Sequence, residues 1–83
     1  MKRVASHYLF IPGKGFMKKY IIEINQGVVV RYYPFSIEVE NTEWFPGVIE
    51  LSPTEKGMVA YLLFPFDFTE MKPVGETQRK LLQ

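Results

Sequence analysis

The sequence contains no cysteine, and His7 is its only histidine. Without cysteine the chain has no disulfide, no thiolate metal ligand and no cysteine nucleophile. As a metal ligand His7 would need carboxylates as partners, and no Asp or Glu lies near it in the sequence. We therefore interpret His7 as a residue of a strand, and we predict no catalytic residue, no metal site and no cofactor.

The sequence also lacks clear motifs for phosphate binding, for nucleophilic catalysis and for cation binding. The Pro-Gly-Lys-Gly segment at 12–15 lacks the glycine spacing of a phosphate-binding loop and the Ser or Thr after its lysine, so we interpret it as a β-turn. A Ser–His–Asp triad would need a context such as a nucleophile elbow, and the sequence shows none. Glu38, Glu40 and Glu43 could attract a divalent cation if a loop gathered them. On a strand, Glu38 and Glu40 would share one face and repel each other, which is typical of a solvated edge.

Long hydrophobic runs are absent as well. The longest, Met58 to Phe66, has nine residues, about half of the roughly 20 that a membrane-spanning helix requires. Charged residues and a proline interrupt the first fifteen positions, unlike the apolar region of an export signal. We therefore expect a soluble, cytoplasmic protein without a membrane partner.

The chain has 83 residues, 47% hydrophobic and 16% aromatic, which is the composition of a folded globular domain. A chain this short forms one domain and buries only about 60% of its unfolded surface, so its core is thin. Dense aromatic packing or association with another chain would have to supply the remaining stability.

Charge is distributed unevenly. Residues 1–33 carry six Lys or Arg and one Glu, whereas residues 34–55 carry five Glu and no base. Either the two segments lie side by side in one sheet, where opposite charges stabilise each other, or they form a polar surface that attracts a second copy or a partner.

Bases stand beside aromatic residues at 18–20 and 31–33, as in platforms that stack single-stranded nucleic acid. The net charge of +1 and the acidic middle of the chain argue against such a partner. Packing in a core explains these aromatic residues, and we predict no nucleic-acid binding.

Alternating apolar and polar residues predict β-strands over most of the chain. Asn25-Gln26-Gly27 is typical of a three-residue hairpin loop with a bulge, and Pro46-Gly47 requires a bend, a bulge or an edge position. We expect Val30 and Leu62 to be buried. The predicted strands are 3–11, 18–25, 28–33, 44–51 and a central strand 58–64, with 35–40 as either an edge strand or an ordered loop.

The character of the sequence changes after Phe66. Residues 67–70 have the spacing of a helix capping box, but Pro73 and Gly75 allow at most one turn. Residues 76–83 are helix formers with few apolar anchors. We therefore predict a strand-rich core over 1–66 and a tail over 67–83, either frayed or a short helix that becomes ordered on docking.

Roughly residues 3–51 resemble the opening of the amidohydrolases. The strand RVASHYLF at 3–10, the hairpin KYIIEINQGVV at 19–29 and the segment FPGVI at 45–49 follow one another as in that family. There, the N-terminal strands belong to a small β-sandwich, the composite domain, and a Pro-Gly-hydrophobic segment leads into a catalytic barrel. The resemblance therefore implies a composite-type sandwich.

The sequence departs from the family at the next step. Where the family has a His-x-His pair that ligates its metal, this chain has Glu50-Leu51-Ser52-Pro53, and it is too short for a barrel of about 200 residues. The resemblance implies the composite domain alone, without catalysis. Residues 58–83 could complete that sandwich.

The sequence thus predicts a single all-β domain over 1–83, a five- or six-stranded sandwich or partly open barrel. Because few strands leave edges exposed, we expect a homodimer. The predicted function is a non-enzymatic structural or protein-interaction module. The alternative is a binder of a small ligand or a peptide, through an aromatic cleft formed by Tyr32, Tyr33, Trp44 and Phe45.

Overall fold

The computed structural model describes residues 1–35 and 41–83, and these residues form strands and turns without a helix. The all-β prediction is confirmed, with seven strands in the described ranges in place of the five or six expected. The strands are β1 (Lys2–Ile11), β2 (Gly15–Lys18), β3 (Tyr20–Asn25), β4 (Val28–Pro34), β5 (Thr42–Thr54), β6 (Gly57–Asp67) and β7 (Lys72–Leu82).

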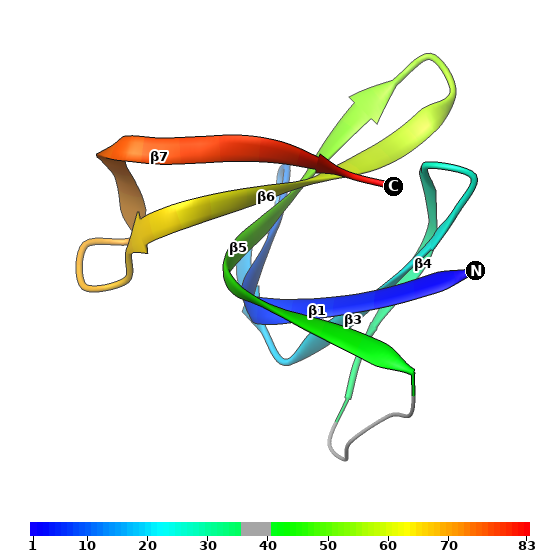
Figure 1. Cartoon of the computed structure of the whole chain (residues 1–83), viewed down its shortest axis with the longest axis horizontal. Helices are drawn as coiled ribbons and strands as arrows, with labels where there is room; N and C mark the ends of the chain where they lie inside the picture. Colours follow the sequence, from blue (N-terminus) through cyan, green and yellow to red (C-terminus); the bar gives the residue numbers. More distant parts are fainter. Residues whose placement is uncertain (36–40) are drawn as a thin grey trace.

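The seven strands belong to one sheet that curls into a partial ring (Figure 1). The order is β2-β1-β3-β4-β6-β5, and β5 returns to pair in parallel with β1. Between β4 and β6 the pairing is limited to Val29 opposite Met58. From Ala60 onward β7 lies against β6, and the two strands project from the ring together. The ring therefore stays open and does not become a barrel.

The predicted hairpin between β3 and β4 forms, but its loop has two residues in place of three, because Asn25 pairs with Val28. The loop residues Gln26 and Gly27 both have positive φ angles, 53° and 80°, as a tight two-residue loop requires. A separate bulge lies further along β4, where Val30 is the extra residue between the pairs Glu23–Arg31 and Ile24–Val29.

Pro46 and Gly47 form a second bulge, in β5. Ser6 pairs with Phe45 and Tyr8 pairs with Val48, so the two residues of β5 face His7 alone on β1. A proline cannot donate to a ladder and a glycine tolerates unusual φ angles, which explains why the extra residue is accommodated here.

The basic and acidic parts of the sequence meet in the sheet. β1 from the basic segment runs beside β5 from the acidic segment, and Lys2 Nζ lies 3.6 Å from Glu43 Oε1. Of the two interpretations, this observation favours complementary neighbours within one sheet.

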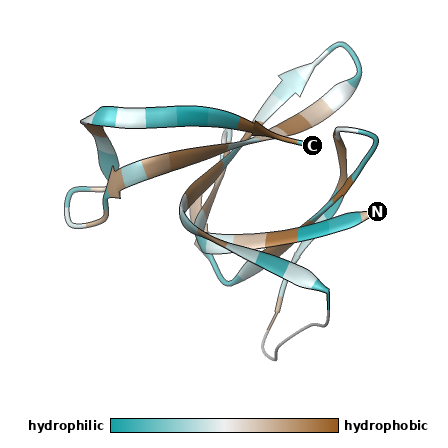
Figure 2. Cartoon of the chain, viewed as in Figure 1, coloured by the Kyte–Doolittle hydropathy of each residue, from teal (hydrophilic) through white to brown (hydrophobic). Residues whose placement is uncertain are grey.

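The hydrophobic core fills the inside of the ring. Apolar residues of β1, β3 and β5 alternate toward it, and the apolar end of the otherwise hydrophilic β7 closes it from the side (Figure 2). The buried core residues are Val4, Leu9, Ile11, Ile22, Ile24, Ile49, Leu51, Ala60 and Leu82.

Three expectations are corrected by the structure. Residues 67–83 are not a frayed or helical tail, because the turn after Asp67 returns the chain as β7 and Leu82 anchors it in the core. The strand expected over 18–25 is interrupted at Lys19, whose φ is +58°, so that β2 and β3 are separate. Val30 is 49% exposed, because it is the extra residue of the bulge in β4, while Val29 and Tyr32 on either side pack against the core.

Substituting Leu62 and Val30 tests this assignment of faces. Leu62 is half-buried and packs against the core, so Leu62→Ala should lower the free energy of unfolding by about 1–2 kcal/mol. Val30→Ala removes exposed methyl groups and should cost less than about 0.5 kcal/mol. Urea denaturation of both variants measures the difference, and equal losses would contradict the assignment.

Candidate functional site

Seven rings form a continuous cluster on the outer surface, which we call the aromatic face. It lies on the side of β1 opposite the core, since Tyr8 and Phe10 alternate with the buried Leu9 and Ile11. Neighbouring rings have centroid separations of 5.0–6.2 Å, mostly in the edge-to-face or tilted arrangements that favour aromatic pairs. The rings belong to His7, Tyr8, Phe10, Phe16, Trp44, Phe66 and Phe68.

The aromatic face is buried at its centre and exposed at its margins. Phe66 is 9% exposed and contacts both Phe16 and Phe68. Trp44, Phe16 and Phe68 are 52%, 38% and 37% exposed. An apolar hollow of about 180 Å³ lies beside Phe66, with Met71 among its lining residues. Large apolar rings gathered around a hollow are typical of surfaces that contact another molecule.

His7 links the two halves of this face. Its imidazole lies edge-to-face against Trp44 of β5 and against Phe68 of the β6–β7 turn, with both centroid distances 5.1 Å. Its Nδ1 accepts a hydrogen bond from the backbone N–H of Gly47, at 3.3 Å. An accepting Nδ1 carries no proton, so the neutral ring has its proton on Nε2.

Cations stand at the rim of the face. Lys18 Nζ lies 5.6 Å from the centre of the Tyr8 ring. Cζ of Arg79 lies 3.7 Å from the centre of the Tyr61 ring, which is outside the seven rings of the face. Nε of Arg79 donates at 3.1 Å to Glu50, which lines the hollow beside Phe66. Both contacts hold the charged groups beside the rings, as in the polar rim of an interface.

The four residues predicted to form one cleft are divided between the two faces of the sheet. Tyr32 and Phe45 pack against the core. Tyr33 and Trp44 share an outward cross-strand row, but β1 and β3 lie between them, about 14 Å along the sheet at the usual strand spacing. Trp44 alone joins the aromatic face, so the expected single cleft is not formed.

Most of the aromatic face was missed because two of its elements were not predicted. Phe16 belongs to the short β2, and Phe68 begins the turn into β7, which the sequence suggested as a tail. The alternation of Tyr8 and Phe10 in strand 3–11 was the available signal. It shows that these rings share a face but not what covers them.

Glu23 forms a second polar cluster, on the same outer side of the sheet. Its side chain is 2% exposed, Arg3 Nε donates to Oε2 at 3.0 Å, and Arg31 Nε donates to Oε1. The Tyr33 hydroxyl donates to Oε2 at 2.9 Å. These donors, with Arg31 the strongest, lower the pKa of Glu23 from 4.5 to about 2 against the opposing effect of burial. The pKa of Tyr33 is raised, chiefly by the same hydrogen bond. Three donors hold the Glu23 carboxylate in its ionised form. We therefore interpret this cluster as structural, because the carboxylate does not readily accept a proton.

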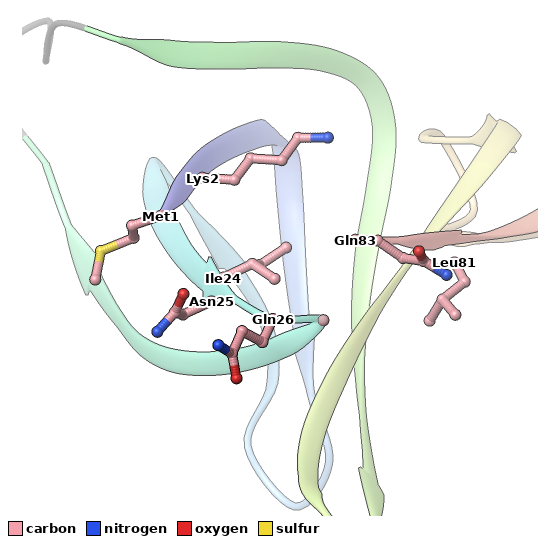
Figure 3. A pocket seen from close by; sticks show the side chains of 8 residues that line it. Met1, Lys2, Ile24, Asn25, Gln26, Leu81 and Gln83 are labelled. Carbon is pink, nitrogen blue, oxygen red and sulfur yellow. The ribbon is translucent and has the colours of Figure 1, made fainter.

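A second cavity lies at the mouth of the ring, where both chain ends meet the β3–β4 loop (Figure 3). It has a volume of about 610 Å³. Ile24 and Leu81 provide apolar surface, and the amides of Asn25, Gln26 and Gln83 provide polar groups. None of the residues of the aromatic face lines it.

Over residues 1–35 and 41–83, no group of three or more His, Cys, Asp and Glu side chains is placed to hold a metal ion. Glu43, one of the three carboxylates considered for a cation, pairs with Lys2. The other two, Glu38 and Glu40, lie outside the described residues, as does most of the edge strand or loop expected over 35–40.

The part of the chain that the structure describes contains no helix that is long and apolar enough to cross a membrane. Comparisons with protein-family models, with curated proteins and with solved structures found no match for this chain.

Proposed function

We propose that this chain is a non-enzymatic protein-interaction module that binds a second copy of itself through the aromatic face. The observation that carries the proposal is the continuity of the seven rings, four of which, including His7, expose more than a third of their surface. Contiguous exposed aromatic surface is costly in water and is enriched at the centres of protein interfaces.

The spread of the rings over several elements supports self-association. The aromatic face extends over β5, β1 and β2 and along the end of β6 onto the β6–β7 turn. A two-fold axis through such a face brings rings against rings, an arrangement that aromatic side chains accommodate by offset or edge-to-face stacking.

Light scattering over a concentration series, with Trp44→Ser and Phe16→Ser combined in one chain, tests the proposal. We expect the wild type to dimerise and the double variant to dimerise at least about tenfold more weakly, because two large exposed rings of the face are lost. Phe64→Ser is the matched control, since Phe64 is 48% exposed and belongs to none of the ring contacts of the aromatic face. A wild type that stays monomeric, or a control that loses as much as the double variant, would contradict the proposal.

A second candidate function is binding of a small ligand. Its support is the cavity at the mouth of the ring, whose volume of about 610 Å³ lies in the range of known ligand sites. A ligand held there would raise the melting temperature through linkage. Leu81→Arg should abolish that rise and leave self-association intact, because Leu81 lines this cavity and not the aromatic face. A rise that survives Leu81→Arg would place the ligand elsewhere.

The relation to the amidohydrolase composite domain belongs to the same proposal, as does a location in the cytoplasm. The relation is supported by the order of the strand, the hairpin and the Pro-Gly segment, and the chain departs from the family where it lacks the His-x-His pair. A module of this kind would keep the supporting sheet of such an enzyme without its catalytic barrel.

A further inference from the structure

We infer that His7 is a pH-sensitive latch of the aromatic face. Its neutral imidazole holds the part of the face that contains Trp44 against the part that contains Phe68, and its protonated form releases them. The inference rests on the proposed function only where it concerns self-association, since the latch itself is a property of the single chain. It follows from the place of His7 opposite a β-bulge, and from the hydrogen bond that its imidazole accepts from the backbone N–H of Gly47.

The bulge leaves one backbone donor that the ladder does not satisfy. Two residues of β5, Pro46 and Gly47, face His7 alone on β1, and Pro46 has no N–H. The N–H of Gly47 is therefore the donor in excess, and Gly47 is buried. A buried N–H requires a partner, and here the partner is Nδ1 of His7.

Protonation removes that partner. In the imidazolium ion both ring nitrogens carry hydrogen, so Nδ1 changes from an acceptor into a donor and faces the donor of Gly47. The ring must turn away or the bulge must move. Histidine is the side chain that ordinarily changes its charge between about pH 5 and 8, so this is the interval over which the latch is tested.

The ring that turns is also the ring that joins Trp44 to Phe68. Both of its edge-to-face contacts depend on the orientation that the hydrogen bond to Gly47 sets. Loss of that orientation separates the β5 part of the aromatic face from the part carried by the β6–β7 turn. Self-association through the intact face should therefore weaken in acid.

The charged groups on the elements around His7 are already paired. Glu43 of β5 pairs with Lys2, and the Asp67 carboxylate accepts the N–H groups of Thr69 and Glu70 beside Phe68. Glu70 pairs with Lys72, and Lys18 of β2 lies over Tyr8. Comparison with a variant at position 7 therefore separates a response of His7 from a response of these groups.

The latch is tested in the monomer by recording the Gly47 amide resonance and Trp44 fluorescence between about pH 5 and 8. In the wild type both signals should follow one titration with a common midpoint. His7→Asn is the matched control, because the amide oxygen of Asn can take the place of Nδ1 and stays an acceptor at every pH. Its signals should be flat. His7→Leu, which has no acceptor, should show the acid-form Trp44 signal at neutral pH.

Two results would overturn the latch. One is a Gly47 resonance that stays constant while the His7 ring protons titrate, and the other is an unchanged titration of Trp44 fluorescence in His7→Asn. Light scattering at both ends of the pH range, on the same samples at high concentration, separates this inference from the proposed function. If the Gly47 resonance follows pH but the chain never dimerises, only the proposed function is contradicted. If the chain dimerises but the Gly47 resonance stays constant, only the latch is contradicted.

Discussion

Gly47→Ala is expected to lower the free energy of unfolding by about 3 kcal/mol or more, enough to unfold much of a domain of this size. The φ angle of Gly47 is +115°, in a region that residues with a Cβ rarely adopt. A Cβ built there lies 2.4 Å from the carbonyl oxygen of Leu63 and 3.3 Å from Cβ of Phe64. Because the closest atom belongs to the backbone of β6, a side-chain rotation cannot relieve the overlap.

Chemical denaturation of Gly47→Ala measures this loss, with Gly75→Ala as the matched control. Gly75 has no positive φ, and a Cβ built on it meets nothing within 4 Å. The control should change stability by less than about 0.5 kcal/mol. If Gly47→Ala were as stable as the control, β5 would not approach β6 as closely at the bulge as the structure has it.

Protonation of Glu23 in acid is expected to destabilise this domain and to contribute to its unfolding. Arg31, Arg3 and Tyr33 lower the pKa of Glu23 in the folded chain from 4.5 to about 2. A group whose pKa is lower in the folded state stabilises the fold above its unfolded pKa, and this stabilisation is lost as the pH falls toward its folded pKa. Between these values the ratio of folded to unfolded chain should fall by up to about tenfold per pH unit.

Glu23→Gln should remove this part of the acid sensitivity and destabilise the domain at neutral pH. The amide keeps the shape of the carboxylate but carries no negative charge. It therefore does not compensate the positive charges of Arg3 and Arg31 at a position where the Glu23 side chain is 2% exposed. Stability is measured by urea unfolding at several pH values. Glu55→Gln, in an exposed turn, is the control and should retain the wild-type slope. A wild-type slope in Glu23→Gln would show that other groups cause the acid dependence.

Local sequence signals predicted the elements whose geometry is decided within a few residues. Asn25-Gln26-Gly27 gave the β3–β4 hairpin, because positive φ angles are accessible to Gly and tolerated in such loops. The bulge at Pro46 and Gly47 was one of the predicted options for the same kind of reason. The alternation in 3–11 separates Leu9 and Ile11 from Tyr8 and Phe10, but it assigns Val4 and His7 to the wrong sides, since Val4 is in the core and His7 lies among the surface rings.

The error over residues 67–83 concerns long-range pairing. Residues 72–82 have weak strand propensity and many exposed side chains, and they become β7 because β6 offers an unpaired edge and the core accepts Leu82. Propensity there was overridden by contacts with residues distant in the sequence. The other two errors are local: Val30 is the extra residue of a bulge, and Lys19 has a positive φ angle that interrupts its strand.

By itself, the sequence determined the all-β class, the absence of cysteine chemistry, the hairpin and the alternation of its strands, because each depends on residue type or on short spacings. Only the tertiary structure decided that Trp44 meets His7 and Phe68 while Phe45 turns to the core, and that Glu23 is enclosed by two arginines. These arrangements depend on strand register, where a shift of one residue exchanges the two faces of a strand. Register in this ring is set by the bulge of β5 opposite His7 and by the return of β7 along β6, and both join residues far apart in the chain.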